Sequence, residues 1–482
     1  MDLADFLLNA TARAVGRAIS SGQTTSQAVT AWYLERIERF NGSAGGQGGI
    51  NAVRSVSPQA LAQAAAADAE IAAGRNRGPL HGVPYLVKDN VFCADGTPAS
   101  AGCRALAEFV PPYEATLVAR LREAGAVLLG KTNLTEFADF VSDVMPTEFS
   151  GAGGVVRNPL GLRYDRGQGS SVGSAAAVAA RFCAFAIGSE TQNSIQAPAT
   201  ATSVVGFKPT VGRVSRHGIV PLVPSQDSPG CLTVSVDDAS LVLAAIAGAD
   251  MHDAATLSFF GGAGGGETAG SLQGVRIGVP RRFVADNAMN EDRQAAFGRV
   301  LKALSQAGAV LVDPCDLPSA EQLNEVRSCV FRTEFKASLD SLLGSLAPCG
   351  MRSMADIVAW NRSHPEAIPY GQSLLEAAQS TKGLLDPQYV ADRRRDVALS
   401  VEGGIVAALR AGGAQVLLAP MTAAAKCTGK AGAPVLAIPA GPDAIGAPFG
   451  ITLFAAPGQD AVVLRIGAAI EQVAGERIVP QL

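Results

Sequence analysis

Three polar turns in the first half of the chain carry the side chains that could perform chemistry. One is the serine- and glycine-rich segment 167–174 (GQGSSVGS), which leads into an alanine-rich apolar run. The second is the segment 189–198 (SETQNSIQAP), which follows an apolar run and contains Ser194. The third places Lys88 directly after the apolar residues 83–87. Serine hydroxyls and an amine are the groups from which a serine nucleophile and its base can be built.

Lys88 is the residue of this set that could activate a serine. A serine hydroxyl is a weak nucleophile and needs a base. Where histidine is not used, a lysine can serve if burial lowers its pKa enough for a neutral fraction to exist near pH 7. The serine-rich turn also meets the start of a predicted helix, whose unpaired N–H groups supply a positive potential. A purely structural interpretation fits the same residues, with Ser170 and Ser171 as helix caps and Lys88 in a surface ion pair.

The segment 125–132 (GAVLLGKT) matches the phosphate-binding pattern GxxxxGK[ST] letter for letter. Its four central residues are apolar and read as a buried strand, whereas a phosphate loop must wrap these residues around its ligand with their N–H groups pointing inward. No acidic strand end suited to magnesium is evident. We therefore predict a structural strand here and no nucleotide site.

The segment 169–173 (GSSVG) matches the nucleophile elbow GxSxG, with Ser171 as the nucleophile. An elbow must follow a strand, but residues 158–168 contain proline, glycine and charges and read as a loop. The elbow also needs a later aspartate and histidine, and His217, His252 and His364 carry no local signature. These observations favour a different role for Ser171.

The elements that would position these turns are helices and short apolar strands. Three segments share one pattern, in which a helix end is followed by a glycine and an apolar run of strand length: 121–129, 304–312 and 409–417. Glycine can adopt the left-handed conformation that ends a helix. A helix that returns into a buried strand is typical of α/β proteins. We therefore predict an α/β fold with a central mixed, largely parallel twisted sheet.

The N-terminal region is predicted to be helical, because apolar residues recur at helical spacing and Thr25 or Ser26 can cap a helix. We expect helices over residues 3–20, from Thr25 or Ser26 through Ile37, and over 58–74. The glycine run 261–266 is interpreted as a surface loop rather than a domain boundary, because αβ units lie on both sides of it.

The composition argues against several classes of function. The chain has 482 residues and a formal net charge of −4, with no basic patch, so neither nucleic acid nor membrane is expected as a partner. Eight scattered cysteines read as reduced core residues, and four histidines leave little for a zinc site. We expect no metal and no cofactor. No signal peptide is evident and the apolar run 175–187 is shorter than the roughly 20 residues that span a bilayer, so we expect a cytoplasmic protein.

The sequence resembles the amidase signature family, and within it the bacterial peptide amidases. The similar segments are 78–90, 124–134, the serine-rich loop and 205–212, with weaker similarity at 225–230 and 448–452. The 24 residues that separate Ser170 from Ser194 equal the family's spacing between its two catalytic serines. The resemblance implies one α/β domain over 1–482, with helices on both sides of the sheet and a signature core at 78–215. It also implies that Lys131 and Lys208 are structural. We expect the region 315–400 to be helical, to pack over the substrate cleft and to set specificity.

The resemblance also implies a Ser–Ser–Lys triad. Ser194 would attack the amide carbonyl, and Ser170, which follows a cis peptide bond in the family, would relay the proton. Lys88 would act as the base and would then protonate the leaving group. Ser171 would orient Lys88 or Ser170.

The oxyanion hole implied by the resemblance consists of backbone N–H groups of Thr191, Gln192, Asn193 and Ser194. The family usually has glycine just before the nucleophile, where this chain has Gln192 and Asn193. Asparagine tolerates left-handed conformations, so we expect the turn to persist with an altered shape. Val172 replaces a glycine or serine of the family. The segment 420–434 is shorter than the corresponding segment of the peptide amidases, which borders the substrate cleft. We therefore expect a reshaped, more open pocket.

The leading hypothesis is therefore an amidase that acts on a small-molecule or peptide amide, with a homodimer as a possible assembly. One alternative is the glutaminase subunit of an amidotransferase, which shares the same signature. Another is a catalytically impaired member of the family that serves as a binding protein, an idea motivated by Gln192, Asn193 and Val172.

Overall fold

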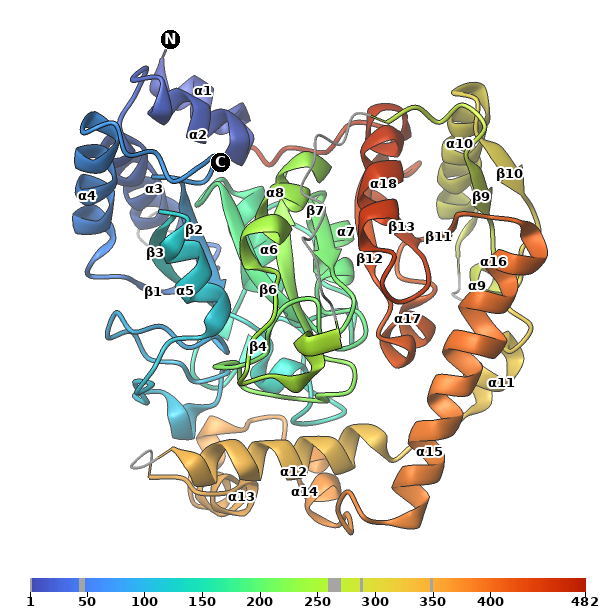
Figure 1. The fold of residues 1–482 in the computed structure, drawn as a ribbon. Helices are drawn as coiled ribbons and strands as arrows, with labels where there is room; N and C mark the ends of the chain where they lie inside the picture. Colours follow the sequence, from blue (N-terminus) through green and yellow to red (C-terminus); the bar gives the residue numbers. More distant parts are fainter. Residues whose placement is uncertain (1, 43–47, 259–269, 287–288, 347–349) are drawn as a thin grey trace.

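A single mixed sheet of eleven strands runs through the molecule (Figure 1). The computed structural model describes residues 2–42, 48–258, 270–286, 289–346 and 350–482; the predicted glycine loop 261–266 and Cys349 lie outside them. The strand order is β1-β3-β2-β6-β8-β7-β12-β13-β11-β9-β10. The strands are β1 Val53–Val56, β2 Pro84–Lys88, β3 Val127–Thr132, β6 Phe185–Glu190, β7 Val205–Lys208, β8 Ser228–Thr233, β9 Arg276–Gly278, β10 Val310–Val312, β11 Val416–Pro420, β12 Val435–Pro442 and β13 Pro448–Phe454, with a separate pair β4 Phe149–Ser150 and β5 Gly154–Val155.

The mixed sheet flanked by helices is confirmed, but its parallel pairing is confined to two blocks. Strands β3, β2 and β6 are parallel at one end, and β11, β9 and β10 are parallel at the other. The other six neighbouring pairs are antiparallel, so the expectation of a largely parallel sheet is too strong. Parallel neighbours need a crossover connection, whereas the short link from β12 to β13 allows only an antiparallel pair.

The three predicted αβ units are confirmed. Helices α5 (Thr116–Glu123), α10 (Glu291–Gln306) and α16 (Ala407–Gly412) precede β3, β10 and β11. Each helix is followed by a glycine with a positive φ, at Gly125, Gly308 and Gly413. Only a residue without a Cβ adopts this conformation at little cost, so the glycines end the helices and turn the chain back into the sheet.

Helices cover both faces of the sheet, as the side-chain alternation of β12 shows. Leu436 of β12 packs against Gly467 of α18 (Asp460–Ala474). Ala437, the next residue, lies opposite Gly206 of β7, and Gly206 faces α7 (Gln196–Thr202). Successive side chains of a strand point to opposite faces, so α18 and α7 lie on opposite sides of the sheet.

Outside residues 315–400, the other described helices are α1 Leu3–Asn9, α2 Ala12–Ser20, α3 Ser26–Asn41, α4 Ala60–Ala72, α6 Val172–Ala179, α8 Val236–Ile246, α9 Arg281–Asp286 and α17 Ala425–Ala431. Short 3-10 helices lie at Arg104–Leu106, Glu136–Ala138 and Ala254–Ser258. The helices predicted from Thr25 and over 58–74 are confirmed as α3 and α4. All eight residues of α6 are buried, so this helix lies in the core behind the serine-rich turn.

The prediction of a single helix over residues 3–20 is wrong, because the helix is interrupted between α1 and α2. Ala10 is extended, and the hydroxyl of Thr11 caps α2 by accepting from the Ala14 N–H at 3.1 Å. The buried guanidinium of Arg181 donates to the carbonyls of Leu7 and Ala10, which satisfies the C-terminal end of α1. Thr11 is a local signal for this interruption, whereas the contribution of Arg181, which is distant in sequence, could not be read from local periodicity.

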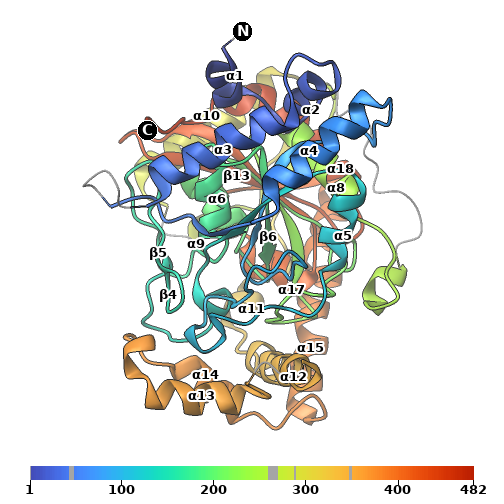
Figure 2. The same cartoon turned by 90° about the vertical axis from the view of Figure 1, so that its left-hand side faces the viewer.

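The segment 315–400 is helical. Its helices are α11 Ala320–Glu325, α12 Val330–Ser345, α13 Met354–Ser363, the 3-10 helix Pro365–Ala367, α14 Ser373–Gln379 and α15 Pro387–Val397, followed by a π-helical stretch Ala398–Val406. Figures 1 and 2 both place α12, α13 and α14 together at the end of the molecule opposite α1 and α2. Their buried apolar side chains form a second hydrophobic cluster together with residues such as Phe137, Val141 and Leu222.

Within the described ranges, no helix is long and apolar enough to cross a membrane. The seven described cysteines are free thiols, and six of them are buried. No group of three metal-binding side chains (His, Cys, Asp or Glu) gathers among the described residues.

Candidate active site

The three polar turns meet at the carboxyl ends of the parallel strands β2 and β6. Strands β2 and β6 are parallel neighbours, with Val87 opposite Ile187, so Lys88 at the end of β2 lies beside the end of β6. The serine-rich turn precedes α6, which packs against both strands. The sequence indicated each turn separately, and the strand order brings them together.

Lys88 is buried and bonded to the serine turns. Its Nζ donates to Ser170 Oγ at 2.7 Å, to Ser189 Oγ at 3.0 Å and to the Ser189 carbonyl at 3.2 Å. The residue is 0% exposed, so the interpretation of Lys88 as a member of a surface ion pair is wrong. The peptide bond between Gly169 and Ser170 is cis, as the resemblance implied.

Burial lowers the pKa of Lys88 from its usual 10.5 to about 7. Loss of hydration disfavours the ammonium, and this effect outweighs the carboxylates of Asp227, Glu190 and Asp139, which act in the opposite direction. A lysine with a pKa of about 7 is neutral in about half of the molecules at pH 7. Lys88 can therefore accept a proton under ordinary conditions.

Ser171 occupies the N-cap position of α6, but its side chain makes no cap bond. Its hydroxyl donates instead to the Ser189 carbonyl at 3.1 Å, the same carbonyl that accepts from Lys88. Its backbone N–H donates to the Ser194 carbonyl at 3.0 Å. Ser171 thus ties the turn that carries Ser170 to the turn that carries Ser194.

The turn that holds Ser194 leaves its N–H groups unpaired. Among the described residues, no protein acceptor bonds the backbone N–H groups of Thr191, Gln192, Asn193 or Ser194. Neither Gln192 nor Asn193 adopts a positive φ, so the turn has no need of glycine there. Asn193 also anchors the turn, because its Nδ2 donates to the Gly167 carbonyl at 2.8 Å.

Glu190 holds this turn from behind and was missed by the sequence reasoning. Its buried carboxylate accepts from the backbone N–H groups of Ile195 at 2.6 Å and Gln196 at 2.9 Å, and from the Gln196 side chain at 2.8 Å. Burial raises the pKa of Glu190, while Lys208 opposes that effect. These bonds fix the start of α7 directly after Ser194.

Asp139 is a second acid that the sequence reasoning missed. It lines the same cleft as Ser194, and its backbone is left-handed, with φ 74°. Burial raises its pKa to about 7, while the positive charges of Lys88 and Arg166 act in the opposite direction. The only sequence signal is its place just after the family-like segment 124–134.

Ser194 opens onto a cleft of about 550 Å³ that extends to the helical region. The cleft is lined on one side by the turn 191–194 and Asp139, and on another by Phe331 and Arg332 of α12 and by Leu374 of α14. Lys426 and Lys430 of α17 also line it. Residues from the region 315–400 therefore border the same cleft as Ser194.

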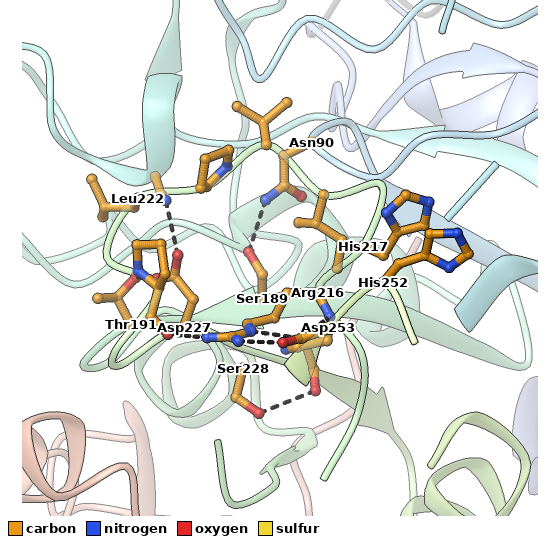
Figure 3. A pocket seen from close by; sticks show the side chains of 16 residues that line it. Asn90, Ser189, Thr191, Arg216, His217, Leu222, Asp227, Ser228, His252 and Asp253 are labelled. Atoms are coloured by element: carbon orange, nitrogen blue, oxygen red, sulfur yellow. Dashed lines mark hydrogen bonds and ion pairs between the residues drawn. The ribbon is translucent and has the colours of Figure 1, made fainter. Parts of the chain in front are cut away.

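A second pocket of about 220 Å³ adjoins the site behind Ser189 (Figure 3). The Ser189 hydroxyl lines it and accepts from Lys88 Nζ and from Asn90 Nδ2, each at 3.0 Å. His217 and His252 line its far side with their rings stacked 4.4 Å apart. Burial lowers the pKa of His217. The Ser189 hydroxyl thus lies between Lys88 and this pocket.

The segment 125–132, which matches the phosphate-loop pattern, contains strand β3, as predicted. All six residues of β3 are buried, and Lys131 donates to the Val91 carbonyl inside the protein. Lys208 is also buried and donates to the Ala433 carbonyl at 2.6 Å. Neither lysine faces the Ser194 cleft.

Val172 and the segment 420–434 have different surroundings. Val172 is fully buried in the core and does not line the cleft. The segment 420–434 contains α17, whose Gly429 lies against the turn 191–194. A Cβ at Gly429 would lie 2.6 Å from the Gln192 side chain and 2.8 Å from the Thr191 carbonyl. This glycine lets α17 pack directly on the turn.

Comparison with known proteins identifies the family. The family model described as Amidase matches residues 28–464. The X-ray structure of the native peptide amidase from Stenotrophomonas maltophilia is similar with a TM-score of 0.88 and 37% identity, over 98% of each chain. A curated relative from Schizosaccharomyces pombe, named as an amidase, is 31% identical over 94% of this chain and 83% of its own length.

A glutamyl-tRNA(Gln) amidotransferase subunit from Azoarcus sp. is 41% identical over 321 residues. That match spans 65% of this chain and 63% of the relative, which is less than two thirds of the relative's length.

Proposed function

The chain belongs to the amidase family, and from that premise we propose that it hydrolyses carboxamides through an acyl-enzyme formed on Ser194. The observation that carries this proposal is the buried 2.7 Å bond between Lys88 Nζ and Ser170 Oγ, beside a turn with unpaired N–H groups. A serine next to a partly neutral lysine can lose its proton, and unpaired N–H groups can receive a negative oxygen.

In the first step, Ser194 Oγ attacks the carbonyl carbon of the amide. Its proton passes to Ser170 Oγ, while the proton of Ser170 passes to the neutral Nζ of Lys88. A C–O bond forms, and the carbonyl π electrons move onto the oxygen. The N–H groups of the turn 191–194 stabilise that oxyanion, with a contribution of about 3 kcal/mol for a single donor of this kind.

In the second step, the protonated Lys88 returns its proton through Ser170 to the amide nitrogen. The C–N bond then breaks and ammonia or an amine leaves, with Ser194 esterified. Water attacks the ester and gives its proton to Lys88 by the same route. The carboxylate is released, and Ser194 recovers its proton. Ser171 and Ser189 position Lys88 throughout, because both bond the groups around its Nζ.

The region 315–400 borders the cleft and contributes to substrate selection in this proposal. Phe331 and Leu374 supply apolar surface opposite the turn of Ser194. An amide with an apolar portion would bury that portion here.

The test uses a fluorophosphonate probe and a panel of small amides, peptide amides and aryl amides. The probe is expected to label wild-type Ser194 and to leave Ser194→Ala unlabelled. Ser194→Ala and Lys88→Ala are expected to lose amide turnover by more than about a thousandfold. Ser20→Ala, an exposed serine on α2, serves as the control and keeps both properties. Full turnover in both catalytic variants contradicts the proposal.

A second candidate function is the glutaminase reaction of an amidotransferase. The 41% identity to the Azoarcus protein favours it, although that match covers only 63% of the relative. Glutamine hydrolysis together with co-purification of a partner chain would support this candidate. The remaining alternative, a catalytically impaired binding protein, predicts no labelling of Ser194 at all.

A further inference from the structure

The cleft at Ser194 has a strongly cationic wall. We use the name cationic wall for its four basic residues: Arg327, Arg332, Lys426 and Lys430. Asp139 is the one carboxylate among the described residues that line this cleft, and burial raises its pKa to about 7. The cleft therefore holds an excess of positive charge in a chain whose net charge is −4.

Only Lys430 of the four cations forms an ion pair with a carboxylate of the residues that the structure describes. Its partner is the buried Asp396, at 2.5 Å. No carboxylate in the described part of the chain forms an ion pair with Arg327, Arg332 or Lys426. Lys426 Nζ donates to two backbone carbonyls, of Asn324 at 2.9 Å and Val326 at 3.4 Å, which hold it in place but do not neutralise it.

Lys430 and Arg327 are close enough to Lys426 for their charges to affect it. Burial lowers the pKa of Lys426, and the positive charges of Lys430 and Arg327 lower it further. Asp396 acts in the opposite direction but is already bonded to Lys430. Like charges held together at a partly desolvated surface are stabilised by an anion that binds among them.

Two residues of the cationic wall are held beside the turn of Ser194 by the packing of α17. Lys426 and Lys430 lie one turn apart on α17, the helix whose Gly429 packs on Gln192 and Thr191. Arg327 lies just before α12 and Arg332 lies on it, and Phe331 of the same helix adds apolar surface to the cleft. A substrate bound at Ser194 therefore has both an apolar and a cationic surface within the same cleft.

We propose that the preferred substrate is an amide that also carries a carboxylate, which the cationic wall binds while the amide carbonyl lies at Ser194. This inference rests on the proposed function and names its substrate class. Arginine recognises a carboxylate through two parallel N–H donors, so Arg327 and Arg332 are the specificity residues, and Lys426 adds charge. The carboxylate can belong to the acyl part or to the leaving amine.

The test compares matched anionic and neutral amides. Succinamic acid against succinamide places the carboxylate on the acyl part, and N-acetylglycine against N-ethylacetamide places it on the leaving amine. Wild-type kcat/KM is expected to favour the anionic member of at least one pair by about tenfold or more, after the twofold statistical advantage of succinamide is removed. KM for that substrate should rise with salt, because ions screen the attraction.

The double variant Arg327→Gln/Arg332→Gln tests the contribution of the two arginines to substrate binding. We expect its kcat/KM for the preferred anionic amide to fall by about tenfold to a hundredfold, mainly through KM, with the neutral amide changed less than about twofold. Arg352→Gln removes an exposed charge that does not line the cleft and is the matched control, with no change expected. Equal use of both members of each pair, or an equal loss on both in the double variant, overturns the inference.

Competition against fluorophosphonate labelling of Ser194 keeps the test independent of turnover. Succinamic acid or N-acetylglycine should slow labelling of the wild type more than its neutral partner does, and this difference should vanish in the double variant. Labelling that is slowed equally by both members of each pair overturns the inference while the proposed function stands. An absence of labelling in the wild type overturns the proposed function instead.

Discussion

The pH dependence of catalysis tests the central physical claim, that burial makes Lys88 a base. Its pKa falls from 10.5 to about 7. At pH 7 a lysine with the ordinary value would be neutral in only about 3 of 10,000 molecules, whereas Lys88 is neutral in about half. The shift corresponds to about 5 kcal/mol between the two protonation states. Burial therefore increases the population of the active base by about a thousandfold.

The expected profile follows from the sign of this shift. Because Lys88 must be neutral to accept a proton, kcat/KM should rise with pH through about 7 and reach a plateau above it. Below pH 6 it should fall about tenfold for each pH unit. Steady-state kinetics between pH 5 and 9 on a good amide substrate measure this profile. A limb centred near 10 would refute the claim that burial activates Lys88.

Asp139 provides a control, because burial raises its pKa to about 7 as well. In Asp139→Asn the negative charge that favours the Lys88 ammonium is gone, so the pKa of Lys88 should fall and the limb should move to lower pH. If the limb disappeared instead, Asp139 would be the titrating group and the assignment to Lys88 would be wrong.

Three further substitutions test the hydrogen bonds, the packing and the buried charge around the site. Glu190→Gln places an amide group against N–H donors, so we expect a loss of about 1–3 kcal/mol in the free energy of unfolding, measured in urea, and at least about a tenfold lower kcat. Gly173→Ala would place a Cβ 2.1 Å from the Asn133 carbonyl and should destabilise by about 1–3 kcal/mol, whereas Gly298→Ala, which has open space, should not. Lys88→Met should raise Tm at pH 7, with the gain shrinking as pH rises towards 10.5: the folded protein binds fewer protons at Lys88 than the unfolded chain between about pH 7 and 10.5. An unchanged Tm in Lys88→Met would mean that burial of this amine costs little.

Much of the fold could be predicted from the sequence because the relevant signals are local. A helix end, a glycine and an apolar run identified the units that end in β3, β10 and β11. The same local reasoning rejected the phosphate-loop match at 125–132, since four consecutive apolar residues belong in a buried strand. It failed at residues 3–20, where Thr11 caps a second helix and the distant Arg181 bonds the carbonyls at the end of the first.

The residues of the candidate site were also evident in the sequence, though their arrangement was not. Polar turns after apolar runs drew attention to Lys88, Ser170 and Ser194, and the family resemblance proposed their roles. No local pattern indicated that Gln192 and Asn193 would adopt ordinary negative φ values. That observation removes the backbone reason for requiring glycine at these two positions.

The sequence by itself determined which turns carry hydroxyl and amine groups and which segments form strands, because these depend on residues a few positions apart. Only the tertiary structure decided that Lys88 is fully buried, and hence that its pKa lies near 7. Only the structure placed Glu190 behind the turn of Ser194 and the cationic wall in front of it. Burial and charge proximity depend on strand order and on helices hundreds of residues apart, and no local pattern encodes them.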